Sequence, residues 1–229
     1  MQPVFHSEQK SKQPVQDLPA AEQQSQQHGD QINIQLFKNH AFTEENTHGH
    51  AQHGKHEAAQ GQTAQQSAAQ QMQILSVAQR GEAVLQLKAA PVSAAEFNSP
   101  WLQQFSLAMY ATMTARNGVG IAAPQVFLSK RIIIVGSRPN ARYPDAPEMD
   151  AVLMINPEII EQSSELCLGE EGCLSVPNAR GQVSRAEWVK LRYYTMLGEY
   201  VEAEYHGFPA RIVQHEIDHL DGVLFVDRI

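Results

Sequence analysis

Residues 209–222, near the end of the chain, have the sequence PARIVQHEIDHLDG, and this segment predicts a helix. Proline suits the first turn of a helix and glycine the position just after the last turn, so the helix should begin near Pro209 and stop at Gly222. The polar positions are surrounded by apolar residues, namely Ile212, Val213, Ile217 and Leu220. We therefore expect a buried helix, in which histidine and glutamate side chains need a partner or a chemical role.

Within this segment His215, Glu216 and His219 form an H-E-x-x-H pattern. Residues four apart lie on one face of a helix, so both imidazoles can reach one metal ion. Glu216 can then move the proton of a water beside that ion. An isolated match can also mark an exposed, charged helix face, but the apolar neighbours favour the metal hypothesis here.

A third protein ligand is expected, because catalytic metal sites of this type use three ligands from the protein. Metallopeptidases with this pattern usually take it from further along the chain. The residues after His219 contain no His, Glu or Cys, and Asp221 and Asp227 are their only carboxylates. The third ligand should therefore lie upstream of the helix.

Cys173, in the motif EGCLS, is the upstream candidate. It follows Gly172, where backbone amides can approach a substrate closely. A lone cysteine is more often a small buried hydrophobic residue, and we interpret Cys167 in that way.

Another segment, GVGIAAPQ at residues 118–125, has glycines that allow close backbone approach and an amide donor in Gln125. It lacks the strand-then-helix setting of a nucleotide-binding motif.

The rest of this region predicts a strand-rich α+β fold. Ser99 and Pro100 mark the start of a first helix, which Asn117 and Gly118 end. Strands, short extended runs and one hairpin around Leu197 and Gly198 complete the domain. The ranges expected to be extended are 73–77, 84–87, 131–135, 151–156, 188–194 and 200–205. One helix before the strands and one after them argue against an alternating parallel sheet.

Composition divides the chain into two parts. Residues 1–72 hold 17 Gln and 7 of the 10 His with few apolar runs, which predicts a disordered Gln/His-rich arm. The histidines of this arm could chelate a transition metal, but a solvated tail is the favoured interpretation. Residues 73–229 carry nearly all the Val, Ile, Leu and aromatic residues. They are enough for one hydrophobic core, so we expect one catalytic domain behind an arm.

Charge and targeting signals narrow the classes of protein. The net charge is -8 with no cluster of basic residues, which argues against a nucleic-acid partner. No apolar stretch approaches the length of a membrane span. The first residues lack a secretory signal, and organellar import is not supported because the first arginine is Arg80. Two cysteines form no disulfide framework, so the expected location is the cytoplasm.

Three segments together resemble the polypeptide deformylase family. They are GVGIAAPQ at 118–125, EGCLS at 171–175 and QHEIDH at 214–219, in that order. The resemblance covers residues 73–229 and implies mixed or antiparallel sheets packed around a central metal-binding helix. It also implies a metal-dependent hydrolase that removes the formyl group from the N-terminal formyl-methionine of newly made polypeptides, releasing formate.

The resemblance also implies roles for individual residues. Cys173, His215 and His219 would bind one divalent metal, most often Fe(II), with Zn, Ni or Co as alternatives. Glu216 would act as the acid and base. The oxyanion would be stabilised by the Gln125 amide and the Leu174 backbone N–H. Substrate contacts would come from Val119, Gly120, Gly172 and Arg180, and the methionine pocket from Val119, Phe208, Ile212 and His215, with Arg211 near it.

The chain departs from the family pattern in two places. Gly81 to Leu85 replaces the usual Asp-Pro-x-Leu turn, and the chain ends at Ile229 without the C-terminal helix of many members. Neither departure removes a ligand or the acid/base.

A monomer with transient ribosome contact is expected. The alternatives are an H-E-x-x-H metallopeptidase, a non-catalytic metal-binding paralogue and a thiol-dependent hydrolase using Cys173.

Overall fold

The computed structural model describes residues 73–229, so the arm predicted at 1–72 lies outside the described residues. The predicted α+β class is confirmed. The described strands form a five-stranded antiparallel sheet in the order β1-β2-β3-β6-β7 and a two-stranded antiparallel ribbon, β4-β5. The elements are α2 (Pro100–Ala115), β1 (Gly120–Ala122), β2 (Ile132–Ser137), β3 (Met149–Gln162), β4 (Leu166–Cys173), β5 (Val176–Ala186), β6 (Trp188–Tyr194), β7 (Tyr200–His206) and α3 (Gly207–Leu220).

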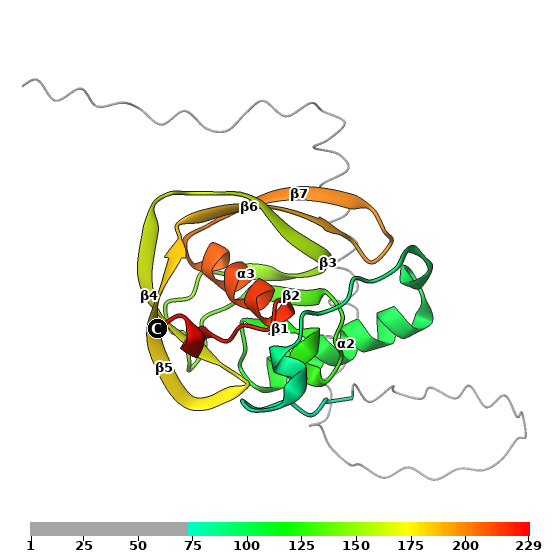
Figure 1. Ribbon diagram of the computed structural model, residues 1–229, viewed down its shortest axis with the longest axis horizontal. Coiled ribbons are helices and arrows are strands. Elements are labelled where there is room, and N and C mark those ends of the chain that lie inside the picture. The colour runs from blue at the N-terminus through cyan, green and yellow to red at the C-terminus, as the bar shows by residue number, and fades with distance from the viewer. Residues whose placement is uncertain (1–72) are drawn as a thin grey trace, which may run out of the picture.

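The large sheet is covered by a helix on each face, and strand β2 shows why. All of its residues are buried, and the first four alternate between two apolar clusters. Ile133 and Val135 belong to the cluster that contains the apolar face of α3. Ile132 and Ile134 belong to the cluster that contains the apolar residues of α2. Because successive side chains of a strand point to opposite faces, the sheet separates the two helices (Figure 1).

Helix α2 begins and ends where its sequence signals predict. The Ser99 hydroxyl accepts a hydrogen bond from the Leu102 N–H at 3.2 Å, and Pro100 is the first helical residue. Asn117 follows the helix with a φ of 53°, a left-handed conformation that asparagine tolerates. The helix therefore delivers the chain directly to Gly118, where strand β1 approaches the candidate site.

Two of the predicted extended runs are not strands. Residues 73–77 form no strand, and the prediction for 84–87 is wrong because Ala83–Gln86 is a 3-10 helix. This single turn buries Leu85 completely, and burial of that side chain accounts for the apolar run. The prediction at 151–156 is right but short, since β3 extends over Met149–Gln162. The hairpin β6–β7 is confirmed, with Gly198 at a φ of 82° in its turn.

The β4–β5 ribbon is an element that the sequence did not predict. It arches beside α3, which lies in the middle of the molecule (Figure 1). Val183 and Phe225 pack with Cys173 in a third, small apolar cluster that joins the ribbon to the last turn of the chain. Helix α3 contacts β1, β2 and β7 of the large sheet as well as β5 of the ribbon. Within residues 73–229, none of the helices has the length and apolarity to cross a bilayer.

Candidate metal centre

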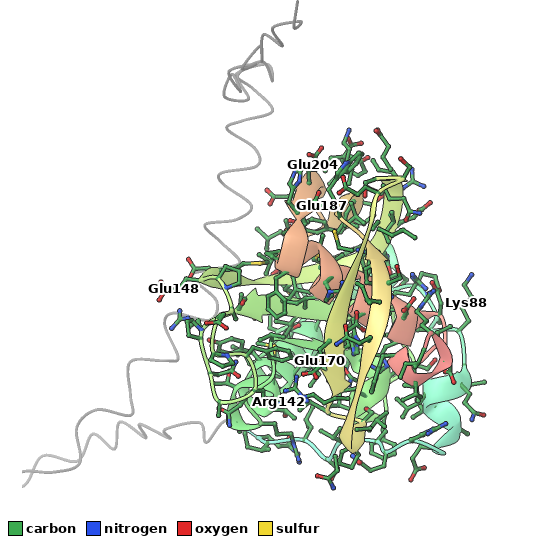
Figure 2. All side chains as sticks on the ribbon, turned by 90° about the vertical axis from the view of Figure 1, so that its left-hand side faces the viewer. Lys88, Arg142, Glu148, Glu170, Glu187 and Glu204 are labelled. Atoms are coloured by element: carbon green, nitrogen blue, oxygen red, sulfur yellow. The ribbon has the colours of Figure 1, made fainter. Side chains whose placement is uncertain are left out.

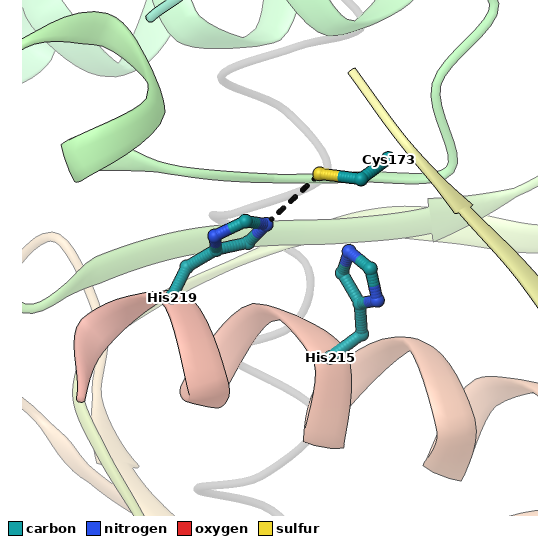
Figure 3. A group of neighbouring side chains, drawn as sticks. All are labelled: Cys173, His215 and His219. Atoms are coloured by element: carbon teal, nitrogen blue, oxygen red, sulfur yellow. Dashed lines mark hydrogen bonds between the residues drawn. The ribbon is translucent and has the colours of Figure 1, made fainter. Parts of the chain in front are cut away.

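The proposed ligands come from two elements that are far apart in sequence. His215 and His219 lie one turn apart on α3, and Cys173 is the last residue of β4 (Figure 3). Their ligand atoms all lie within 4.8 Å of one another. The Cys173 Sγ is 3.2 Å from the His219 Nε2, and the two imidazole rings are 5.1 Å apart at their centroids. The predicted set of three donors is therefore brought together.

The charges at this cluster suit a metal ion. Burial raises the pKa of the Cys173 thiol, but His219 and His215 outweigh burial and hold that pKa well below its ordinary value. The cysteine is thus favoured as a thiolate, the form that binds metals. Burial lowers the pKa of His215, but Cys173 and Glu171 outweigh it and raise that pKa well above its ordinary value. A metal ion would displace the proton of His215, and one thiolate beside two neutral imidazoles is a donor set that divalent ions such as zinc and iron accept.

Glu171 orients the first histidine, a role that sequence reasoning missed. Its Oε2 lies 2.9 Å from the His215 Nδ1, which directs the other ring nitrogen towards the cluster. Arg185 donates to both Glu171 oxygens at 2.9 Å. Burial raises the pKa of Glu171, but Arg185 and His215 reverse this and keep the carboxylate ionised. Glu171 lies two residues before Cys173 on β4, but no strand was predicted there, so the sequence offered no basis for pairing Glu171 with His215.

Glu216 is buried beside the proposed ligands with one oxygen unpartnered among residues 73–229. Burial raises the pKa of its carboxyl to about 7, against the opposing influence of His215 and His219. Gly120 makes room for it, because a Cβ at that position would lie 2.3 Å from the Glu216 Oε1. An acid with this pKa can both accept and deliver a proton near neutral pH.

Gln125 connects strand β1 to the cysteine. Its Oε1 accepts a hydrogen bond from the Ala122 N–H at 2.9 Å, which fixes the amide orientation. Its Nε2 then donates to the Cys173 Sγ at 3.3 Å and to the Ser175 Oγ at 3.2 Å. The Ser175 N–H also donates to the sulfur, at 3.4 Å. The amide donor predicted at Gln125 is therefore aimed at the cluster, and Ser175 is a partner that the sequence did not identify.

A cavity opens in front of the cluster and is lined by most of the predicted substrate contacts. They are Val119, Gly120, Gly172 and Leu174, together with Phe208, Arg211 and Ile212. Arg180 does not line this cavity; it donates to Glu170 at 2.8 Å and to the Arg142 carbonyl at 2.9 Å. Arg142 and Tyr143, from the loop between β2 and β3, line it instead. Figure 2 shows two of the residues that line the cavity, Arg142 and Glu170, in the lower part of the view, whereas Glu187 and Glu204 lie near its top.

Comparison with known proteins agrees with this geometry. The family model described as polypeptide deformylase matches residues 74–229. Peptide deformylase 2 of Nostoc sp. is 47% identical over 157 residues, which is 69% of this chain and 87% of the relative. Peptide deformylase 2 of Shewanella oneidensis is 44% identical over 154 residues, covering 67% of this chain and 83% of the relative.

Solved structures give the same result. The Met-Ala-Ser-bound class I type b peptide deformylase from Acinetobacter baumannii is 70% identical, with a TM-score of 0.68, covering 69% of this chain and 99% of that one. The peptide deformylase from Thermotoga maritima is 38% identical, with a TM-score of 0.60, covering 68% and 97%. The metallopeptidase and non-catalytic alternatives are set aside. The chain belongs to the polypeptide deformylase family, hydrolases that remove the N-formyl group from newly made polypeptides and use a catalytic metal.

Proposed function

We propose that Cys173, His215 and His219 hold the catalytic metal of this deformylase and that Glu216 is its acid and base. The observation that carries the proposal is the convergence of a sulfur and two imidazole nitrogens within 4.8 Å of one another. Two of these donors, Cys173 and His215, line a cavity that the buried Glu216 carboxyl also lines. Within the described residues, one Glu216 oxygen has no hydrogen-bond partner, which leaves it available to a water or a substrate group. When bound, a divalent ion supplies positive charge that acidifies a water and polarises the formyl oxygen.

Glu216 and Gln125 would carry the proton and the developing charge. Glu216 accepts a proton as the water oxygen attacks the formyl carbon, and then delivers it to the nitrogen as the C–N bond breaks. Formate and a free amino terminus leave. The Gln125 amide and the Leu174 N–H would donate to the formyl oxygen as it gains negative charge, each contributing about 3 kcal/mol. Because Ala122 already fixes the Gln125 amide, this donor is preorganised.

The substrate is a formyl-methionyl peptide that would lie along β1. Val119, Gly120 and Gly172 line the cavity and would pair with its backbone. The methionine side chain would enter between Phe208 and Ile212. Arg180, from the rim of the cavity, would contact later residues of the substrate peptide. The Acinetobacter baumannii relative is described as bound to Met-Ala-Ser, a peptide with methionine first. That tripeptide in its formylated form is therefore the substrate to test.

The metal and the cellular setting form the finer part of the proposal. A thiolate with two imidazoles suits Fe(II), with Zn, Ni and Co as substitutes. The relatives named above are bacterial deformylases. We propose a cytoplasmic monomer that meets nascent chains through transient ribosome contact. Metal analysis of anaerobically purified protein tests the identity of the metal, and gel filtration tests the monomeric state.

Formate release from formyl-Met-Ala-Ser tests the central proposal. The metal-loaded chain should release formate, and Glu216→Gln should lower kcat by about 10²–10⁴-fold while keeping its metal, since the isosteric amide cannot accept a proton. Asp221→Asn is the matched control, because Asp221 ends the same helix and pairs with Arg131 outside the cavity. Full activity in Glu216→Gln with metal bound would exclude Glu216 as the acid and base.

A further inference from the structure

Arg211 is a buried cation of α3, one turn before His215, that ties the helix to the ribbon. Its Nη1 donates to the Glu171 Oε1 at 2.9 Å and to the Val183 carbonyl at 2.8 Å. Its Nη2 donates to the Cys167 carbonyl. The side chain is 11% exposed. One guanidinium thus connects α3 to both strands of the ribbon, β4, which ends in Cys173, and β5.

The ribbon leaves space for this guanidinium at Gly169. A Cβ at that position would lie 2.8 Å from the Arg211 Cζ and Nη2 and 2.9 Å from its Nε. Gly169 is not among the glycines of positive φ, so its backbone conformation does not require glycine. Space for Arg211 is therefore the reason for glycine here, and the two residues form an interlocking pair.

The contact with Glu171 extends to the metal ligands. Glu171 accepts hydrogen bonds from Arg211 and Arg185, and its second oxygen meets the His215 Nδ1. Arg185 runs in the opposite direction, from β5 to Asp218 on α3. Two arginines from opposite elements therefore hold the helix with the histidines against the ribbon with the cysteine. Since a carboxylate that orients a metal-binding histidine controls its direction, any force on Glu171 is transmitted to His215.

We propose that Arg211, with Gly169 as its steric complement, is a positioning residue of the metal centre. It fixes the Glu171 carboxylate and the distance between α3 and the ribbon, so that Cys173 and His215 face the same point. This inference rests on the proposed function of Cys173, His215 and His219 as metal ligands. It concerns retention of the metal, which can be measured without any substrate.

Release of cobalt from the full chain to a chelator tests the inference. Co(II) bound by a thiolate absorbs visible light, so the spectrum reports the Cys173 contact while the decay reports metal loss. Arg211→Met should release cobalt about 10- to 100-fold faster than wild type and alter the spectrum. Arg211→Lys, which keeps the charge and can reach Glu171, should recover part of the retention.

Arg131→Met is the matched control. Arg131 also anchors α3, through Asp221 at 2.8 Å and the Leu220 carbonyl at 3.4 Å, but does not touch Glu171. This variant should lower the melting temperature while cobalt release stays at the wild-type rate. Equal release rates in Arg211→Met and Arg131→Met would mean that Arg211 is only a structural anchor and would overturn the inference.

Gly169→Ala keeps the test decisive if Arg211→Met does not fold. The added methyl group pushes the guanidinium away from the ribbon without removing its charge, so release should become severalfold faster. Wild-type release in Gly169→Ala overturns the inference. A wild-type chain that binds no cobalt contradicts the proposed metal centre itself, so the two failures are distinguishable.

Discussion

Helix α3 and the β4–β5 ribbon would supply the two halves of the proposed metal centre in different ways. The helix places His215 and His219 on one face because they are four residues apart, a relation fixed by local geometry. The ribbon supplies Cys173, whose sulfur meets a histidine 46 positions along the chain. The pairing register shifts between Gly172 and Cys173, so strand periodicity alone does not aim this sulfur. The helix half is therefore encoded locally, and the ribbon half depends on distant contacts.

Removing one ligand from each half has the largest expected effect. Cys173→Ala and His219→Ala should both lose the metal and with it formate release, because either change leaves only two protein ligands. Metal analysis after dialysis and a formate assay measure the outcome. If one variant kept its metal and its activity, the corresponding half would not belong to the centre.

Gln125 tests how the ribbon half is aimed. Gln125→Leu should retain metal but lower kcat by about 10²–10³-fold, because it removes the side-chain amide that would donate to the formyl oxygen as negative charge develops on it. Gln79→Leu is the matched control, since the Gln79 amide also reaches the ribbon, at the Leu174 carbonyl 3.5 Å away, but is exposed. That control should keep kcat within about twofold of wild type. Similar kinetics in the two variants would remove Gln125 from the mechanism.

Glycines of the segment 118–125 test the helix half. Gly120→Ala should lower kcat by about a hundredfold with metal retained, because the new methyl displaces the Glu216 carboxyl. Gly118→Ala is milder, since a Cβ there would lie 3.2 Å from the Met113 Cγ and 3.3 Å from the Leu174 Cδ1. Steady-state kinetics with formyl-Met-Ala-Ser separate the two. A larger loss in Gly118→Ala would show that crowding of Glu216 is not the cause.

The same contrast explains what could be predicted from the sequence. The ends of α2, the strand at 131–135 and the hairpin β6–β7 follow from caps, apolar runs and turn residues. The ribbon inverts the usual pattern: Leu166 and Leu168 are 61% and 70% exposed, whereas Glu171 is 3% exposed. No rule that sends apolar residues inward could identify β4.

The candidate site shows the same difference between local motifs and distant contacts. Cys173, His215, His219 and Glu216 were identified from motifs, and the structure brings them together. Sequence reasoning did not find the partners that orient them, such as Glu171 and Arg185, because those contacts depend on how α3 packs against the ribbon. Arg142 and Tyr143 reach the cavity only through the path of the β2–β3 loop, which no local signal predicts.

Stability offers a finer comparison of the two halves. Val213 on α3 and Val183 on β5 are both fully buried, and each Val→Ala change should cost about 2 kcal/mol of unfolding free energy. Val183 packs with Cys173, whereas Val213 belongs to the main core. In metal-free protein only Val183→Ala should therefore speed alkylation of Cys173. Peptide mass spectrometry distinguishes this thiol from Cys167, for which the expectation of burial is wrong because its side chain is exposed. Equal acceleration in both variants would contradict a separately loosened ribbon.

The smallest effect is expected at Glu96, which belongs to neither half and supplies a baseline. A hydrogen bond from Lys130, with others from Ser93, lowers the pKa of Glu96 from 4.5 to about 2. A carboxyl whose pKa is lower in the folded chain stabilises it above the unfolded pKa, and this contribution is lost as the pH falls towards 2. Glu96→Gln should therefore cost under about 1 kcal/mol at neutral pH, a cost that shrinks below pH 4. Urea unfolding at several pH values measures this, and cobalt release should not change. A pH-independent cost would show that the charge of Glu96 is not what stabilises its turn, whereas altered cobalt release would show that the metal centre responds to any loss of stability.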